Sequence, residues 1–82
     1  GEPQTCRIRV SANGLSQGLL ESIKRLCGEH PGRVPLFVHL LLPEHEVVVR
    51  VKGLSVDPAA ELVTKVETLL GPGSILVEYT SR

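Results

Sequence analysis

Aromatic residues are scarce in this chain. Phe37 and Tyr79 are the only two in 82 residues, and tryptophan and methionine are absent. Domains that bind single-stranded nucleic acid by stacking present several aromatic side chains to the bases. The sequence therefore argues against base stacking, and it leaves weak, salt-sensitive contact with a nucleic-acid backbone as the remaining form of such binding.

Cysteine is equally scarce, with Cys6 and Cys27 as the two examples. Their number and spacing fit neither a Cys-x-x-Cys metal site nor a disulfide-rich scaffold. We interpret both as buried free thiols that act as small hydrophobic side chains. A disulfide between them is the alternative, because the start of the first strand and the end of the following helix would meet at one end of the domain. A cytosolic setting argues against that bridge.

The chain also lacks net charge and a long apolar run. Nine Lys and Arg balance nine Asp and Glu, so the net charge predicts no general attraction to nucleic acid or to an anionic membrane. There is no run of about eighteen apolar residues and no signal peptide, and we therefore expect a soluble, cytoplasmic protein without membrane contact. A chain of 82 residues allows one domain and no large active-site cleft.

Two stretches repeat one pattern, LLESIKRLCG at residues 19–28 and LVTKVETLLG at residues 62–71. In each, apolar residues fall at i, i+1, i+4, i+7 and i+8, which is the one-sided stripe of an amphipathic helix. A glycine closes each stretch where helices commonly end in a left-handed turn. Ser16 is placed to cap the first helix, and Asp57 followed by Pro58 predicts the start of the second.

Four strands are expected around these helices. CRIRV alternates apolar and basic side chains, with the period of a strand that buries one face. LFVHLLL and VVVRVK flank the polar turn PEHE and predict a hairpin, while HPGRVP separates the first helix from it. The predicted strands cover residues 6–10, 36–42, 47–52 and 75–79.

The predicted element order is strand, helix, strand, strand, helix, strand. This order favours an α+β, ferredoxin-like βαββαβ domain, a four-stranded antiparallel sheet with two helices on one face. Neither half could bury its helix stripe and strand face alone, which explains the repeat. We expect residues 1–82 to form this single domain, with flexible ends at 1–5 and 80–82. The start at Gly1, without a methionine, suggests a piece of a longer protein.

The run LLESIKRLCGEHPGRVPLFVHLLLP, followed by a polar hairpin, a strand and GLSVDPAAELVTKVETLLGPG, resembles a known family. It is similar to the C-terminal segment of bacterial DNA polymerase III alpha subunits of the DnaE type. The shared features are the helix ending in HPG, the strand pair after it, and the closing helix ending in LLGPG. The resemblance spans about residues 6–79.

This resemblance implies a role in DNA replication. The parent protein would be a DNA-directed DNA polymerase, a nucleotidyltransferase (transferase), whose active site lies far upstream of this segment. The segment itself would follow a single-strand-binding OB domain and hold the polymerase to the tau subunit of the clamp loader. The resemblance therefore implies a non-catalytic domain for protein-protein interaction, in the form of tau binding.

The residues themselves offer no convergent set for catalysis. Acidic side chains are spread over helix surfaces and turns, so no pair of carboxylates is placed to catalyse. We interpret Ser16, Ser55 and Thr64 as helix caps or helix surface, and no histidine is placed to act as their general base. His39, Glu44, His45 and Glu46 lie close in sequence and could form a metal site, but ligands on a flexible turn, with no neighbouring groups to fix their orientation, make a poor one. We therefore predict no catalytic, cofactor-binding or metal-binding residue.

Glycine-rich stretches could in principle bind phosphate. GPGS and HPGR both follow predicted helices, whereas a phosphate-binding loop precedes a helix and points its amides at the anion. We interpret them as helix ends.

The face of the predicted sheet that no helix covers is the most informative feature for function. It would mix four cations with bulky apolar residues, and Arg7 and Arg9 would neighbour Arg50 and Lys52 if the first and third strands are adjacent. Four like charges side by side destabilise a sheet unless an acidic partner or solvent separates them. The candidate partner-binding residues on this face and in the tail are Arg7, Arg9, Phe37, His39, Leu41, Arg50, Lys52, Tyr79 and Arg82.

Several interpretations of this face stay open. It could dock on the tau subunit or on the neighbouring OB domain of the same chain. It could contact single-stranded DNA weakly, or simply be solvated, with Arg and Lys stems covering the apolar residues. In a different class, ferredoxin-like domains of the ACT type bind small regulatory molecules between paired copies, and ANGLS after the first strand could be the ligand loop.

Overall fold

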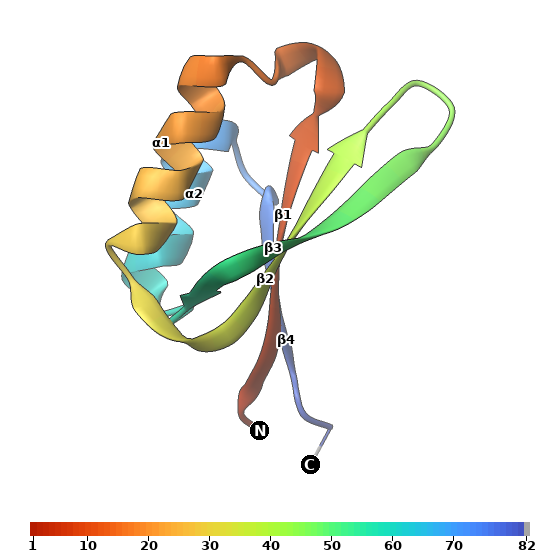
Figure 1. The fold of residues 1–82 in the computed structure, drawn as a ribbon. Helices are drawn as coiled ribbons and strands as arrows, with labels where there is room; N and C mark the ends of the chain where they lie inside the picture. Colours follow the sequence, from red (N-terminus) through yellow and green to blue (C-terminus); the bar gives the residue numbers. More distant parts are fainter. Residues whose placement is uncertain (82) are drawn as a thin grey trace.

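The computed structural model describes residues 1–81, which form one four-stranded sheet and two helices (Figure 1). The predicted element order, βαββαβ, is confirmed, with one short 3-10 turn added before the first helix. The elements are β1 (Pro3–Ser11), η1 (Ala12–Gly14), α1 (Gln17–Gly28), β2 (Pro31–Leu41), β3 (Glu46–Val56), α2 (Ala60–Leu70) and β4 (Ile75–Tyr79). Among these residues no helix has the length and apolar character needed to cross a membrane.

The sheet is mixed, and the prediction of a fully antiparallel sheet is wrong. Its strand order is β3-β2-β1-β4, with β1 parallel to β2 and antiparallel to β4, and with β2 antiparallel to β3. A ferredoxin-like sheet would place β3 between β1 and β2. Here α1 instead returns the chain to the position directly beside β1, as in a βαβ unit.

Both helices cover one face of the sheet, as predicted (Figure 1). The apolar stripe of α1 contributes Ile23 and Cys27 to the core, and that of α2 contributes Leu62 and Val66. These side chains pack on alternate residues of the strands, which is the pattern that a sheet with one buried face requires. The strands contribute Cys6, Ile8, Val10, Leu36, Val56 and Ile75 to the same core.

The helix ends follow the sequence signals in part. Ser16 caps α1 as predicted, since its hydroxyl accepts a hydrogen bond from the backbone N–H of Leu19 at 3.0 Å. Gly71 ends α2 with φ +106°, a conformation that favours glycine. Gly28, in contrast, is the last residue of α1 and has no positive φ, so the prediction of a left-handed stop there is wrong.

The predicted start of the second helix at Asp57 is also wrong. The N–H of Asp57 donates to the carbonyl of His30 at 2.8 Å, which holds this residue beside the start of β2. Helix α2 begins two residues after Pro58, with Ala59 at the N-cap position and no side-chain cap. The backbone contact with β2 therefore takes precedence over the capping signal.

The strands are longer than predicted except for β4. β1 begins at Pro3 and so takes in residues 3–5, which we expected to be a flexible end. β2 begins at Pro31 and includes the stretch that we interpreted as a break. Its pairing with β3 changes register twice, between Pro31 and Val34 and between Pro35 and Phe37, and these irregularities accommodate two prolines in one strand.

The first irregularity of β2 makes Gly32 a position of close approach. A β-carbon built on Gly32 would lie 2.5 Å from the carbonyl oxygen of Val56 and 2.6 Å from the N atom of Asp57, both of them backbone atoms. Backbone cannot swing aside as a side chain does. Gly28, by contrast, has open space around the corresponding position.

We expect Gly32→Ala to lower the free energy of unfolding by about 1–3 kcal/mol, because the β2–β3 junction must move to admit a methyl group. Gly28→Ala serves as the control and should lie within about 1 kcal/mol of the wild type, on the stabilising side. Urea unfolding of the three proteins measures both values. Equal stabilities for the two variants would contradict the close approach at Gly32.

Cys6 and Cys27 are free thiols with no exposed surface, which confirms that they belong to the core. Burial raises the pKa of both thiols from 9.0 to about 11, and for Cys6 the charge of Cys27 adds to the effect. A thiolate is therefore disfavoured in the folded state, and the thiol that packs as a hydrophobe is the form the core accepts.

The raised thiol pKa values predict a stability that depends on pH. Because each folded pKa lies above its unfolded value, the thiols' contribution is fully present below pH 9.0 and is lost as the pH rises toward about 11. Urea unfolding across this range should show a smaller decline for Cys6→Ala/Cys27→Ala than for the wild type. The same decline in both proteins would show that other groups cause it.

Candidate functional site

The sheet face opposite the helices, here called the helix-free face, has its side chains arranged in rows across the strands. In one row Leu76, Arg7, Phe37 and Arg50 follow one another from β4 to β3. In the next row Arg9, His39 and Val48 do so. The two arginines of β1 therefore lie beside β2, and β2 separates them from Arg50. The expectation that they neighbour Arg50 and Lys52 is wrong.

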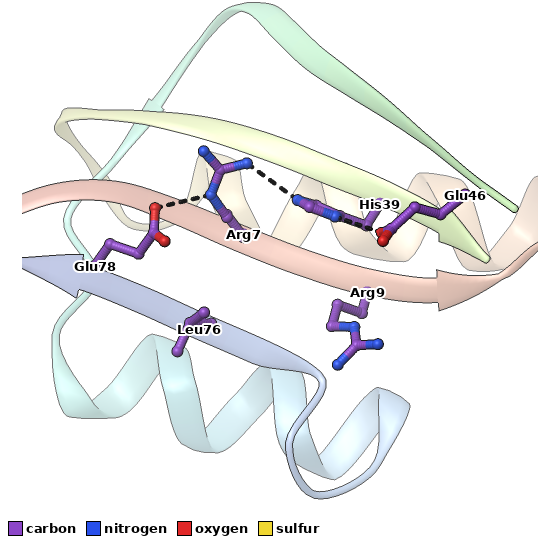
Figure 2. A pocket seen from close by; sticks show the side chains of 6 residues that line it. All are labelled: Arg7, Arg9, His39, Glu46, Leu76 and Glu78. Carbon is purple, nitrogen blue, oxygen red and sulfur yellow. Dashed lines mark hydrogen bonds and ion pairs between the residues drawn. The ribbon is translucent and has the colours of Figure 1, made fainter.

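A series of polar contacts, here called the contact chain, crosses the helix-free face from β4 to β3 (Figure 2). Its members are Glu78, Arg7, His39 and Glu46, together with Thr5. Nε of Arg7 donates to Oε1 of Glu78 at 2.9 Å, and Nη1 of Arg7 lies 3.1 Å from Nε2 of His39. Nδ1 of His39 lies 2.7 Å from Oε2 of Glu46. The hydroxyl of Thr5 also donates to Glu78. Four strands are thus joined by side chains as well as by backbone.

The contacts of His39 specify its tautomer. A guanidinium group only donates hydrogen bonds, so Nε2 of His39 must accept from Arg7. The ring proton then lies on Nδ1 and is donated to the carboxylate of Glu46. His39 therefore links a cation to an anion, and its side chain is only 17% exposed.

Arg7 is held from a third side by an aromatic ring. Its guanidinium carbon lies 4.5 Å from the centre of the Phe37 ring. Such a contact stabilises a cation by about 0.5–1 kcal/mol at a partly exposed site. Phe37 also stands between Arg7 and Arg50 in their row, so it covers one cation and keeps the two apart. The repulsion expected on this face is relieved within the sheet itself.

The middle of the helix-free face is hollowed. The hollow has a volume of about 340 Å³ and is open to solvent along its length. Its walls combine apolar surface with charges of both signs, and Figure 2 shows the side chain of Arg9 extending from β1 with no marked contact to the other side chains drawn. Leu76, on β4, also lines the hollow, and 53% of its surface is exposed. The lining residues are Arg7, Arg9, His39, Glu46, Leu76 and Glu78.

The sequence-predicted residues differ in where the structure places them and in what they contact. Arg7 and His39 belong to the contact chain, and Phe37 lies against the guanidinium of Arg7. Within residues 1–81 the side chains of Arg9, Arg50 and Lys52 make no hydrogen bond or ion pair. Leu41 ends β2 and is partly buried. Tyr79 ends β4, is not among the residues that line the hollow, and is 56% exposed. Arg82 lies outside the described residues.

Three members of the contact chain, Thr5, Glu46 and Glu78, were absent from the candidate set. Thr5 precedes the predicted first strand, and its role depends on the extension of β1 to Pro3. Glu46 was considered only with His39 as a metal ligand. The two do meet, but across residues 1–81 no three His, Cys, Asp or Glu side chains converge on one point. The signal for Glu46 was its position opposite Leu41, which puts it next to His39 once the hairpin closes.

Comparison with known proteins does not assign the chain to a family. No family model matches the sequence, and no curated protein is similar to it at a significant level. The geometry of the helix-free face is therefore the main basis for a functional proposal.

The contact chain predicts a lowered pKa for the carboxyl group of Glu78. The hydrogen bond from Thr5, followed by that from Arg7, holds the pKa of Glu78 below its ordinary value of 4.5. Since the folded pKa is lowered, this carboxylate adds stability above pH 4.5, and that stability is lost as the pH falls through the lowered value.

In Thr5→Val the hydroxyl donor is gone while a β-branched strand residue remains, so the pKa of Glu78 should rise toward 4.5. Thr5→Ser retains a donor and should leave the value nearer to that of the wild type. The chemical shift of the Glu78 carboxyl carbon, followed by NMR during an acid titration, measures all three. An unchanged pKa in Thr5→Val would rule out Thr5 as the main cause.

Proposed function

We propose that this chain is a non-catalytic protein-interaction domain and that the helix-free face is its docking surface. The observation that carries the proposal is the hollow at the centre of that face. Its walls are held in place by the contact chain, while Arg9 and Leu76 project at its border without a partner in residues 1–81. Preorganised side chains lose little freedom on binding, which favours association.

The chemistry of the face indicates the kind of partner. Four cations, Arg7, Arg9, Arg50 and Lys52, stand against two carboxylates, Glu46 and Glu78, so the face is net positive although the whole chain is neutral. Exposed apolar surface at Leu76 and Val48 lies among them. An apolar patch rimmed by basic groups suits a protein segment that is apolar and acidic.

The resemblance of the sequence to the C-terminal segment of DNA polymerase III alpha subunits supplies a candidate for that partner. We propose the tau subunit of a bacterial clamp loader, with the domain acting as the end of a replicative, cytoplasmic DNA polymerase. In that setting the chemistry of nucleotide transfer belongs to another part of the parent chain. The proposal for this domain is attachment alone.

The small-molecule alternative has lost support. It depended on a ferredoxin-like sheet, whose strand order is not the one present. Weak contact with single-stranded DNA is left as an outcome for the test to separate, because Arg9, Arg50 and Lys52 could each face a phosphate.

Amide chemical shifts of the isotope-labelled domain, titrated with a C-terminal fragment of tau, test the proposal. We expect shifts clustered around Arg9, His39 and Leu76. Arg9→Glu should weaken binding about tenfold or more, because it reverses the charge of a hollow-lining cation that no carboxylate of residues 1–81 engages. Leu76→Ser should weaken it through lost apolar contact.

Lys24→Glu is the matched control for Arg9→Glu, since it makes the same change of charge on the exposed surface of α1. It should leave the affinity within about twofold of the wild type. Shifts with tau that avoid the helix-free face would overturn the assignment of the surface. Silence with tau, together with shifts caused by a single-stranded oligonucleotide that fade in high salt, would overturn the assignment of the partner.

A further inference from the structure

β3 is an edge strand with an unusually open outer side. It is eleven residues long and pairs only with β2 within residues 1–81. Val47, Val48 and Val49 are 42%, 48% and 44% exposed, so both faces of this strand present bulky apolar groups to solvent. Soluble proteins usually protect such an edge, because its unpaired N–H and C=O groups readily accept another strand.

An apolar groove runs along the same strand on the helix side of the sheet. Its volume is about 230 Å³, and every residue in its wall is a leucine, isoleucine or valine. α1 forms one side of the groove and the β2–β3 hairpin forms the other, and the hairpin extends beyond the two helices (Figure 1). The lining residues are Leu15, Leu20, Ile23, Val38, Leu40, Val49 and Val51.

The part of β3 that can accept a strand is bounded at both ends. It starts at Glu46, after the turn that Leu42 and His45 close with a backbone hydrogen bond of 2.9 Å. It is interrupted at Gly53, whose φ is +77°, and the pairing with β2 shifts register in this region. Residues 46–52 therefore form the regular segment, and Val49 is its midpoint.

We propose that two copies of this chain associate through β3, pairing antiparallel about a twofold axis that passes through Val49. The two sheets would join into one of eight strands. In this register Val49 faces its own counterpart and Val47 faces Val51 of the second copy. On the other face, Val48 lies opposite Arg50 and Glu46 lies opposite Lys52 of the second copy.

The charges of residues 46–52 favour this register over its neighbours. In an antiparallel pair, directly opposite residues point to the same face of the sheet. The twofold axis must therefore pass between one residue and the same residue of the second copy, and the register is named here by that residue. An axis through Arg50 would place this arginine opposite itself, and an axis through Val51 would place it opposite Lys52. An axis through Val48 avoids like charges but pairs only residues 46–50 within the strand. The Val49 register combines the longest pairing with two cross-strand ion pairs.

The same register covers apolar surface on the helix side. Val47, Val49 and Val51 of each copy would form one continuous strip across the axis, and the two apolar grooves would meet along it. β4 is the other edge of the sheet, but it has only five residues and offers a much shorter edge for pairing. β3 is therefore the edge that a second copy fits.

Sedimentation equilibrium of the chain alone, over a wide range of concentration, tests the proposal. The mass should rise from 8.9 kDa toward twice that value. Val49→Lys should weaken association about tenfold or more, because two ammonium groups then face each other across the axis. Lys52→Glu should also weaken it, and Glu46→Lys/Lys52→Glu should restore it by exchanging the ion pairs. Lys24→Glu, on α1, is the control and should associate as the wild type does.

Circular dichroism verifies that each variant is folded, and intermolecular NOEs in a mixed labelled and unlabelled sample locate the contact. NOEs between the side chains of Glu46 and Lys52 are expected. A mass of 8.9 kDa at every concentration, or a dimer that Val49→Lys leaves intact, would overturn the proposal. No tau is present in these experiments, so their outcome is independent of the test of the helix-free face.

Discussion

The parallel pairing of β1 with β2 is the constraint on which the rest of this structure depends. It places Ile8 beside Val38 at the centre of the sheet, under both helices, and it makes β2 an inner strand. β3 then pairs on the outer side of β2, and β4 pairs on the free side of β1. The composition of the core, the layout of the helix-free face and the exposure of β3 all follow from that one adjacency.

Elements were predictable from this sequence, whereas strand order was not predicted correctly. Helix stripes, the Ser16 cap and alternation in the strands are local signals, and they located all six main elements. Strand order is decided by long-range packing. A signal for it was present, since LFVHLLL is bulky on both faces, as inner strands are, whereas β3 carries Arg50, Lys52 and Gly53, which suit an edge.

The same distinction applies to the candidate site. Alternation assigned Arg7, Arg9 and His39 correctly to one face, because side-chain direction depends only on the strand itself. The contacts between them depend on which strands are neighbours. Placing β2 beside β1 brings Phe37 against Arg7 and His39 within reach of its guanidinium. Of the four cations that the sequence suggested would crowd together, Arg7 therefore contacts Phe37, His39 and Glu78. Glu46 joins this network through His39.

The adjacency of β1 and β2 also divides the molecule into two surfaces with different chemistry. The helix-free face is centred on β1, where polar contacts fix the side chains and leave Arg9 and Leu76 outward. The outer side of β3 lies at the edge of the same sheet, where backbone groups and valines are open. A strand added there would extend the sheet in its own plane and would not cover β1. Edge pairing and face docking are thus geometrically compatible, and a paired molecule would present two copies of the helix-free face on one side of a single sheet.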